Sequence, residues 1–153
     1  MMSLYEVLLF AHVLAAAAWF GAALLSLAYV EFALRADNAG AVVTFGEYDD
    51  ELAKALFIPA ALVTLVAGVA LVFEGPWDWT RDGWTLGGLV LLVAIFALGV
   101  AMILPTGNKV KELGAAGAPA AELRPLIERL RLLSRIDVTL LAVAIFLMTT
   151  KPF

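Results

Sequence analysis

Residues 7–30 read VLLFAHVLAAAAWFGAALLSLAYV, a stretch without lysine, arginine, aspartate or glutamate. A bilayer-spanning helix requires an apolar run of this length, because about 20 residues at a rise of 1.5 Å cover the hydrocarbon core. The stretch contains His12, the only histidine of the chain. An ionisable side chain inside a span is costly to bury and normally faces the protein interior, where it serves a function. The stretch therefore predicts a transmembrane helix and makes His12 the first candidate functional residue.

The composition of the whole chain is that of an integral membrane protein. Of its 153 residues, 63% are hydrophobic and 16% are charged, whereas a soluble domain has about 45–50% apolar and about 25% charged residues. The lack of cysteine excludes disulfides and thiolate metal sites. The net charge of -4 provides no basic surface for nucleic acid. We expect the lipid bilayer to be the main partner of the chain.

Three further apolar segments predict an all-α fold, a four-helix transmembrane bundle that forms a single domain over residues 1–153. We place its helices at about residues 4–32, 55–73, 84–104 and 125–150. The last apolar segment is short, but an amphipathic stretch over residues 123–133 precedes it. We expect this amphipathic stretch to dock either on lipid or on another protein. Because proline is favourable in a first helical turn, we expect the last helix to begin near Pro125.

Lysine and arginine predict the orientation of the bundle. Eight of the ten lie in or beside the two loops that follow the first and third helices. Since cytoplasmic loops carry the excess of positive charge, we expect these basic loops in the cytoplasm and both the N-terminus and the C-terminus outside. Trp77, Trp79 and Trp84, in and beside the outer loop, fit an aromatic belt at the membrane interface.

His12 and Trp19 lie two turns apart on one face of the first helix. The histidine is about 12 Å below the outer helix end, where a neutral imidazole could ligate haem iron or copper, or relay protons. The alternative is a structural histidine bonded to a neighbouring helix, with Thr64 as a partner at similar depth. A closed metal site normally has three or four ligands. Met102 and Met148 are expected near opposite ends of the bundle, and neither obviously completes a site with His12.

Glu31 and Arg135 form a second candidate constellation. Glu31 lies at the end of the first helix and Arg135 near the start of the last, so both are expected at the cytoplasmic boundary. Because an unpaired charge there is costly, we predict a structural ion pair between them. The functional alternative is a proton entry point or an anionic-lipid site. The acidic residues 49–51 precede the second predicted helix, and we interpret them as its solvated N-terminal cap.

Two motifs resemble a loose superfamily of small bacterial membrane proteins. They are HVLAAAAWFGA, which starts at His12, and the ending MTTKPF, which starts at Met148. The superfamily includes the copper-resistance protein D domain, the HemJ-type protoporphyrinogen oxidases and a family described only as predicted integral membrane proteins. Gly87 and Gly88 stand where the HemJ type has a lysine, and the chain is most similar to the last of these families. The resemblance implies a bacterial cytoplasmic (inner) membrane and, for the HemJ type, haem b ligation by the first-helix histidine.

Three classes of function are consistent with these features. In the first, haem b or another redox cofactor binds through His12 with Trp19 beside it, and a homodimer would supply a second His12 as the sixth ligand. In the second, the chain is a non-catalytic partner or assembly subunit of a membrane protein, and His12 is structural. In the third, the chain passes copper or protons, with His12 and Glu31 as waypoints. The sequence does not decide whether the protein is an enzyme.

Overall fold

The computed structural model describes residues 2–78 and 81–152, and the regular structure of these residues is helical throughout. Its elements are α1 (Leu4–Arg35), α2 (Ala39–Leu52), η1 (Ala53–Phe57), α3 (Ile58–Glu74), α4 (Gly83–Leu98), η2 (Gly99–Ile103), α5 (Leu104–Ala115) and α6 (Ala120–Thr150). In this part of the chain four helical stretches are long and apolar enough to cross a membrane: Leu4–Arg35, Ala53–Glu74, Gly83–Ala115 and Ala120–Thr150. The predicted all-α bundle with four spans is therefore confirmed.

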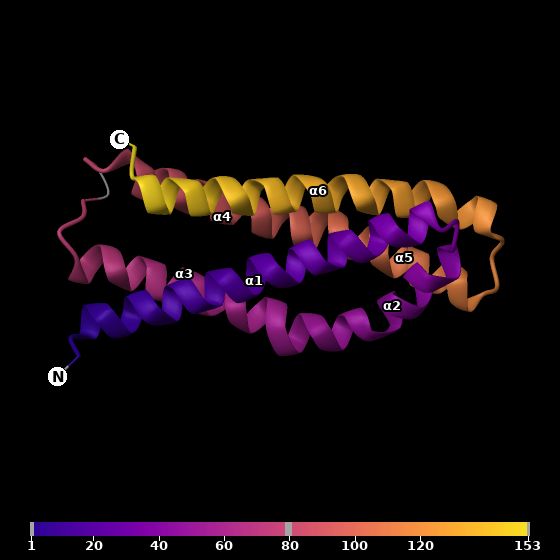
Figure 1. Cartoon of the computed structure of the whole chain (residues 1–153), viewed down its shortest axis with the longest axis horizontal. Coiled ribbons are helices and arrows are strands. Elements are labelled where there is room, and N and C mark those ends of the chain that lie inside the picture. The colour runs from indigo at the N-terminus through magenta and orange to yellow at the C-terminus, as the bar shows by residue number, and fades with distance from the viewer. Residues whose placement is uncertain (1, 79–80, 153) are drawn as a thin grey trace.

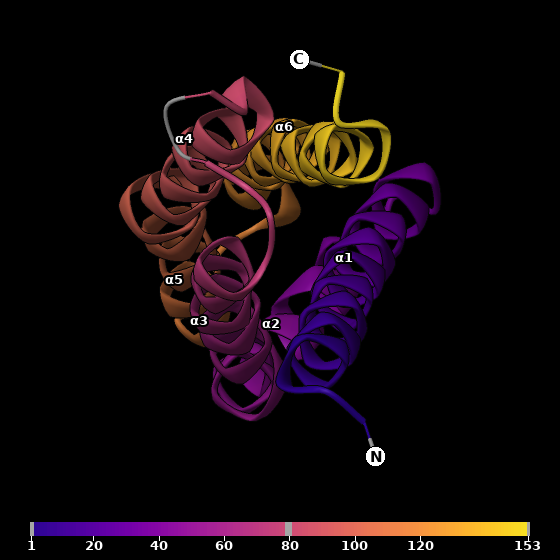
Figure 2. The same ribbon diagram turned by 90° about the vertical axis from the view of Figure 1, so that its left-hand side faces the viewer.

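Four helical columns run side by side along the long axis of the molecule (Figure 1). They are α1, the continuous run α2–η1–α3, the continuous run α4–η2–α5, and α6. Seen end-on, α1 lies between α3 and α6, and α6 lies between α1 and α4 (Figure 2). Both termini lie at one end, which we call the terminal end; the α1–α2 and α5–α6 connections lie at the other, the loop end (Figure 1).

The second and third columns extend further than the apolar segments predicted, because α2 precedes the second segment and α5 follows the third without a break in the helix. Each column contains a five-residue π-helical turn, and Pro59 or Pro105 follows two residues after it. Proline removes one backbone donor from the helical ladder, and a local π adjustment lets the helix continue past it. Residues 49–51 consequently lie within one helical column that starts with α2, so the prediction that they cap the N-terminus of the second helix was wrong.

The last helix also begins earlier than expected. α6 starts at Ala120, after Pro119 in an extended conformation, and Pro125 lies inside the helix. The prediction of a start near Pro125 was therefore wrong, because the helix begins directly after Pro119, its N-cap residue, five residues earlier. The turn before α6 depends on Gly117, whose φ of 75° lies in the left-handed region that favours glycine.

The packed core lies in the middle of the bundle and at the loop end. The middle cluster gathers side chains from α1, α3, α4 and α6: Trp19, Ala23, Ala60, Ala61, Ile95 and Leu141. The second cluster joins α1, α2, α5 and α6 at the loop end: Val30, Ala33, Val42, Val110, Leu123 and Ile127. Small alanines in both clusters let backbones approach closely, as is usual in membrane helix packing. The terminal end is packed differently, because a cavity lies there.

Candidate functional site

The cavity at the terminal end has a volume of about 400 Å³ and lies between α1, α3, α4 and α6. Most of its lining is apolar and includes Leu9, Leu65, Leu89, Leu92 and Ile95. A few polar side chains reach it, namely those of Tyr5, His12, Thr64, Thr85, Thr149 and Lys151. Ligand and cofactor sites commonly combine an apolar cavity of this size with a few polar groups that orient the ligand.

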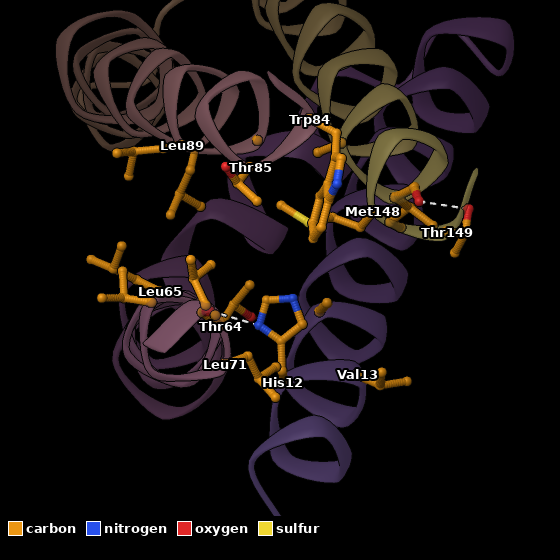
Figure 3. A pocket seen from close by; sticks show the side chains of 18 of the residues that line it. His12, Val13, Thr64, Leu65, Leu71, Trp84, Thr85, Leu89, Met148 and Thr149 are labelled. Carbon is orange, nitrogen blue, oxygen red and sulfur yellow. Dashed lines mark hydrogen bonds between the residues drawn. The ribbon is translucent and has the colours of Figure 1, made fainter. Parts of the chain in front are cut away.

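His12 reaches the cavity from α1 and is anchored to α3. Its Nδ1 lies 2.8 Å from the main-chain oxygen of Thr64. A carbonyl oxygen only accepts hydrogen bonds, so Nδ1 carries the proton and donates it; in the neutral imidazole, Nε2 then carries the lone pair. In Figure 3, Nε2 points away from Thr64 into the cavity, toward the side where Trp84 and Met148 lie. His12 therefore presents a potential metal-ligating nitrogen to an apolar space.

Gly68 on α3 makes room for the imidazole ring. A Cβ atom at this position would lie 2.8 Å from Cε1 and 3.1 Å from Nδ1 of His12, closer than side chains normally approach. The hydroxyl of Thr64, also on α3, is buried without a hydrogen-bond partner within the described residues. The structure thus brings His12 and Thr64 together, as the structural alternative expected, but through the backbone carbonyl of Thr64 rather than through its hydroxyl.

Trp19 forms the inner wall of the same cavity. Its side chain is 7% exposed, and its ring packs edge to face against Phe96, with 5.8 Å between the ring centres. It belongs to the middle core cluster and separates the cavity from the loop end. The predicted pair of His12 and Trp19 therefore shares one cavity, with the histidine nearer to the helix end.

Met148 is the cavity residue that the sequence interpretation missed. It lies on α6 and lines the cavity with His12. We had expected Met148 to lie far from His12 because the depth of each residue was counted from the end of its own helix. Those ends are not level, because α1 extends beyond the end of α6 at the terminal end (Figure 1). His12 and Met148 consequently meet at the same cavity.

A lysine and two tryptophans lie at the outer side of the cavity. The Nζ atom of Lys151 is 3.7 Å from the ring centre of Trp77 and 5.2 Å from that of Trp84. The two rings pack edge to face, 5.1 Å apart. Trp84 is 6% exposed and faces the cavity, so it does not belong to a lipid-facing aromatic belt; Trp79 lies outside the described residues. A cation held over ring faces in this way is stabilised by the ring quadrupoles.

Glu31 and Arg135 lie together at the loop end, far from the cavity. The Nε atom of Arg135 donates a 2.6 Å hydrogen bond to Oε1 of Glu31, and the guanidinium also forms an ion pair with this oxygen. The side chain of Glu31 is 15% exposed and that of Arg135 is 53% exposed. The pair joins α1 to α6 across the bundle. A second bridge at this end, 2.9 Å long, joins Asp37 to Arg124.

The donor set limits the metal chemistry of the site. Within residues 2–78 and 81–152, no three histidine, aspartate or glutamate side chains gather as a metal-binding group. A metal held only by protein normally needs three or four such ligands. A metal cofactor that carries some ligands of its own needs only one or two ligands from the protein. The cavity offers His12 as one such ligand.

Four membrane-crossing helical columns around an apolar cavity define a multi-pass integral membrane protein. The family model described as predicted integral membrane protein (DUF2269) matches residues 6–152, so the chain belongs to that family. No curated protein and no solved structure matches the chain.

Proposed function

We propose that this protein binds haem b in the cavity at the terminal end, with Nε2 of His12 as an axial ligand. The observation that carries the proposal is the hydrogen bond from His12 to the carbonyl of Thr64. Metal-ligating histidines almost always donate their other ring N–H to a carbonyl or carboxylate, which sets the tautomer and the ring orientation. Here that bond directs Nε2 into the apolar cavity of a membrane span.

The residues around the cavity fit an iron porphyrin better than a bare metal ion. The porphyrin supplies four nitrogen ligands itself, so one or two axial protein ligands complete the site. The apolar lining matches the hydrocarbon rim of the macrocycle, and Lys151 stands at the outer side, where it can pair with a propionate. The buried, unpaired hydroxyl of Thr64 beside the cavity is available to a bound group or a water molecule.

Each of these residues has a distinct task in the proposed site. His12 donates its ring nitrogen, Thr64 and Gly68 hold the imidazole in place, and Trp19 closes the inner wall. The apolar lining excludes water, which favours the less charged state of a redox centre. A bound haem b would supply one-electron redox chemistry to these residues.

We also propose how the protein lies in its membrane. The loop end carries most of the lysines and arginines, and the positive-inside rule assigns such an end to the cytoplasm. The cavity and both termini then lie toward the outer face of a bacterial inner membrane. In this orientation the residues that would hold the haem, His12 among them, lie nearer to the outer face than to the cytoplasm.

One observation favours a second function, that of a partner or assembly subunit without chemistry. The bond between His12 and Thr64 joins α1 to α3, and such a bond by itself stabilises a membrane bundle. Passage of copper or protons has less support. Glu31 lies about 28 Å from His12 along α1, it is ion-paired with Arg135, and the middle core cluster lies between the two ends.

A reduced-minus-oxidised absorption spectrum tests the proposal. The protein is expressed with a haem precursor, purified in mild detergent and assayed for haem per chain. We expect a stoichiometric Soret band that His12→Ala abolishes and that added imidazole restores in His12→Gly. The matched control is Tyr29→Phe, because Tyr29 also bonds a backbone carbonyl between helices, at the loop end.

The opposite result would refute the haem proposal. If the wild-type protein has no Soret band, and His12→Ala only lowers the melting temperature as Tyr29→Phe does, then the histidine is structural. That outcome would favour the second function, a partner or assembly subunit.

A further inference from the structure

Met148 brings a sulfur donor to the cavity that His12 also lines. Its side chain comes from α6, whereas His12 comes from α1, and both line the cavity. Figure 3 shows the thioether of Met148 and the imidazole of His12 reaching into this space from different helices, with Nε2 directed toward the methionine side. A methionine sulfur is one of the soft donors that proteins use as an axial haem ligand.

The neighbouring helix leaves a slot for this side chain. Gly88 on α4 is buried, and a Cβ atom there would overlap with the terminal methyl group of Met148 and lie 3.6 Å from its sulfur. A Cβ at position 88 would therefore displace the terminal methyl group of Met148, although its sulfur would be at an ordinary van der Waals distance. The glycine allows Met148 to lie across α4 with its sulfur beside the cavity.

The other polar groups around the cavity are less suited to the position opposite His12. The hydroxyl of Thr85 donates to the carbonyl of Asp82, and the hydroxyl of Thr149 donates within its own helix. Tyr5 lies two turns from His12 on the same face of α1, so it approaches from the same side. Lys151 is held over the tryptophan rings.

We infer that Sδ of Met148 is the second axial ligand of the haem, opposite Nε2 of His12. The inference rests on the proposed function and deepens it. A single chain then supplies both axial ligands, so the site does not need a second copy of His12 from a homodimer. Methionine–histidine ligation raises the reduction potential and leaves no open position for a substrate or gas. The site would therefore act as an electron carrier, whose partner is a one-electron donor or acceptor.

The test compares Met148→Leu with wild-type protein in the haem-loaded state. Leucine keeps the volume and polarity close to those of methionine but removes the sulfur. We expect the variant to retain stoichiometric haem, to lose the sulfur-to-iron charge-transfer band of the ferric protein, and to have a lower reduction potential. We also expect its ferrous form to bind carbon monoxide, which the wild-type protein resists. Met148→His should restore a six-coordinate, low-spin spectrum without that band.

The control is Met102→Leu, because Met102 lies in η2, away from the cavity, and is 39% exposed. This variant should match the wild-type spectrum and potential. If His12→Ala abolishes the Soret band but Met148→Leu leaves the spectrum, the potential and carbon monoxide binding unchanged, then the inference is wrong and the haem proposal stands. If wild-type protein takes up no haem, the haem proposal and the inference fail together.

Discussion

Replacement of Gly68 by alanine would measure how tightly α3 holds the imidazole of His12. The new Cβ would lie 2.8 Å from Cε1 and 3.1 Å from Nδ1 of the ring. The ring is also fixed by its 2.8 Å bond to the carbonyl of Thr64, so it can move away only by giving up that bond. The substitution therefore combines a steric clash with the loss of an interhelical hydrogen bond.

The expected destabilisation follows from three contributions. Overpacking of a well-packed site costs about 1–3 kcal/mol. An interhelical hydrogen bond in a membrane protein contributes about 0.6 kcal/mol on average and up to about 1.7 kcal/mol. Alanine in place of glycine within a helix stabilises by roughly 0.5–1 kcal/mol. We therefore expect Gly68→Ala to lower the free energy of unfolding by about 2 kcal/mol.

The matched control is Gly21→Ala, because Gly21 also lies in a membrane span and a Cβ there would meet nothing within 4 Å. It should be neutral, or stabilise by up to about 1 kcal/mol. Both variants are unfolded by stepwise replacement of mild detergent with sodium dodecyl sulfate, and tryptophan fluorescence and circular dichroism follow the transition. If the two variants agree within about 0.5 kcal/mol, a margin in which additive effects are not resolved, the tight contact between Gly68 and His12 does not exist in the membrane protein.

Three other changes test the packing of the bundle. In a double-mutant cycle, Glu31→Gln and Arg135→Gln should show a coupling energy of about 1 kcal/mol that salt weakens, because the arginine is half exposed; additive effects would show that the pair contributes nothing. Thr64→Val should leave the free energy of unfolding unchanged or raise it by about 1 kcal/mol, because it removes an unpaired buried hydroxyl and keeps the carbonyl that holds His12; a clear loss of stability would show that the hydroxyl has a partner. Pro125→Ala should raise the melting temperature and stabilise α6 by up to about 3 kcal/mol, because it restores a backbone donor inside the helix; a lower melting temperature would contradict this account.

The four spans could be predicted from the sequence because their signal is local. A run such as residues 7–30 must be helical in a bilayer, since each backbone group needs a partner within the segment. The helix boundaries at the loop end were harder to predict. The predicted spans began at about residue 55 and ended at about residue 104, but α2 continues the second column and α5 continues the third through the π-helical turns beside Pro59 and Pro105. Whether a proline ends a helix in a membrane depends on the tertiary contacts around it.

The candidate site was predictable only in part. His12 stood out because an ionisable residue inside an apolar span is rare, and Trp19 followed from helical spacing. Which side chains Gly68 and Gly88 make room for could not be predicted, because those side chains come from other helices.

The sequence by itself determined that this chain crosses a membrane with four helices and that one span carries a histidine. Apolar length, charge position and helical period are properties of consecutive residues, and they do not depend on how the helices meet. Only the tertiary structure decided that Nδ1 of His12 donates to α3 and that Met148 lines the same cavity. The rotation and the axial offset of one helix against another set these relations, because α1 extends beyond α6 at the terminal end (Figure 1). Side chains at different depths on their own helices are thereby brought to one level in the bundle.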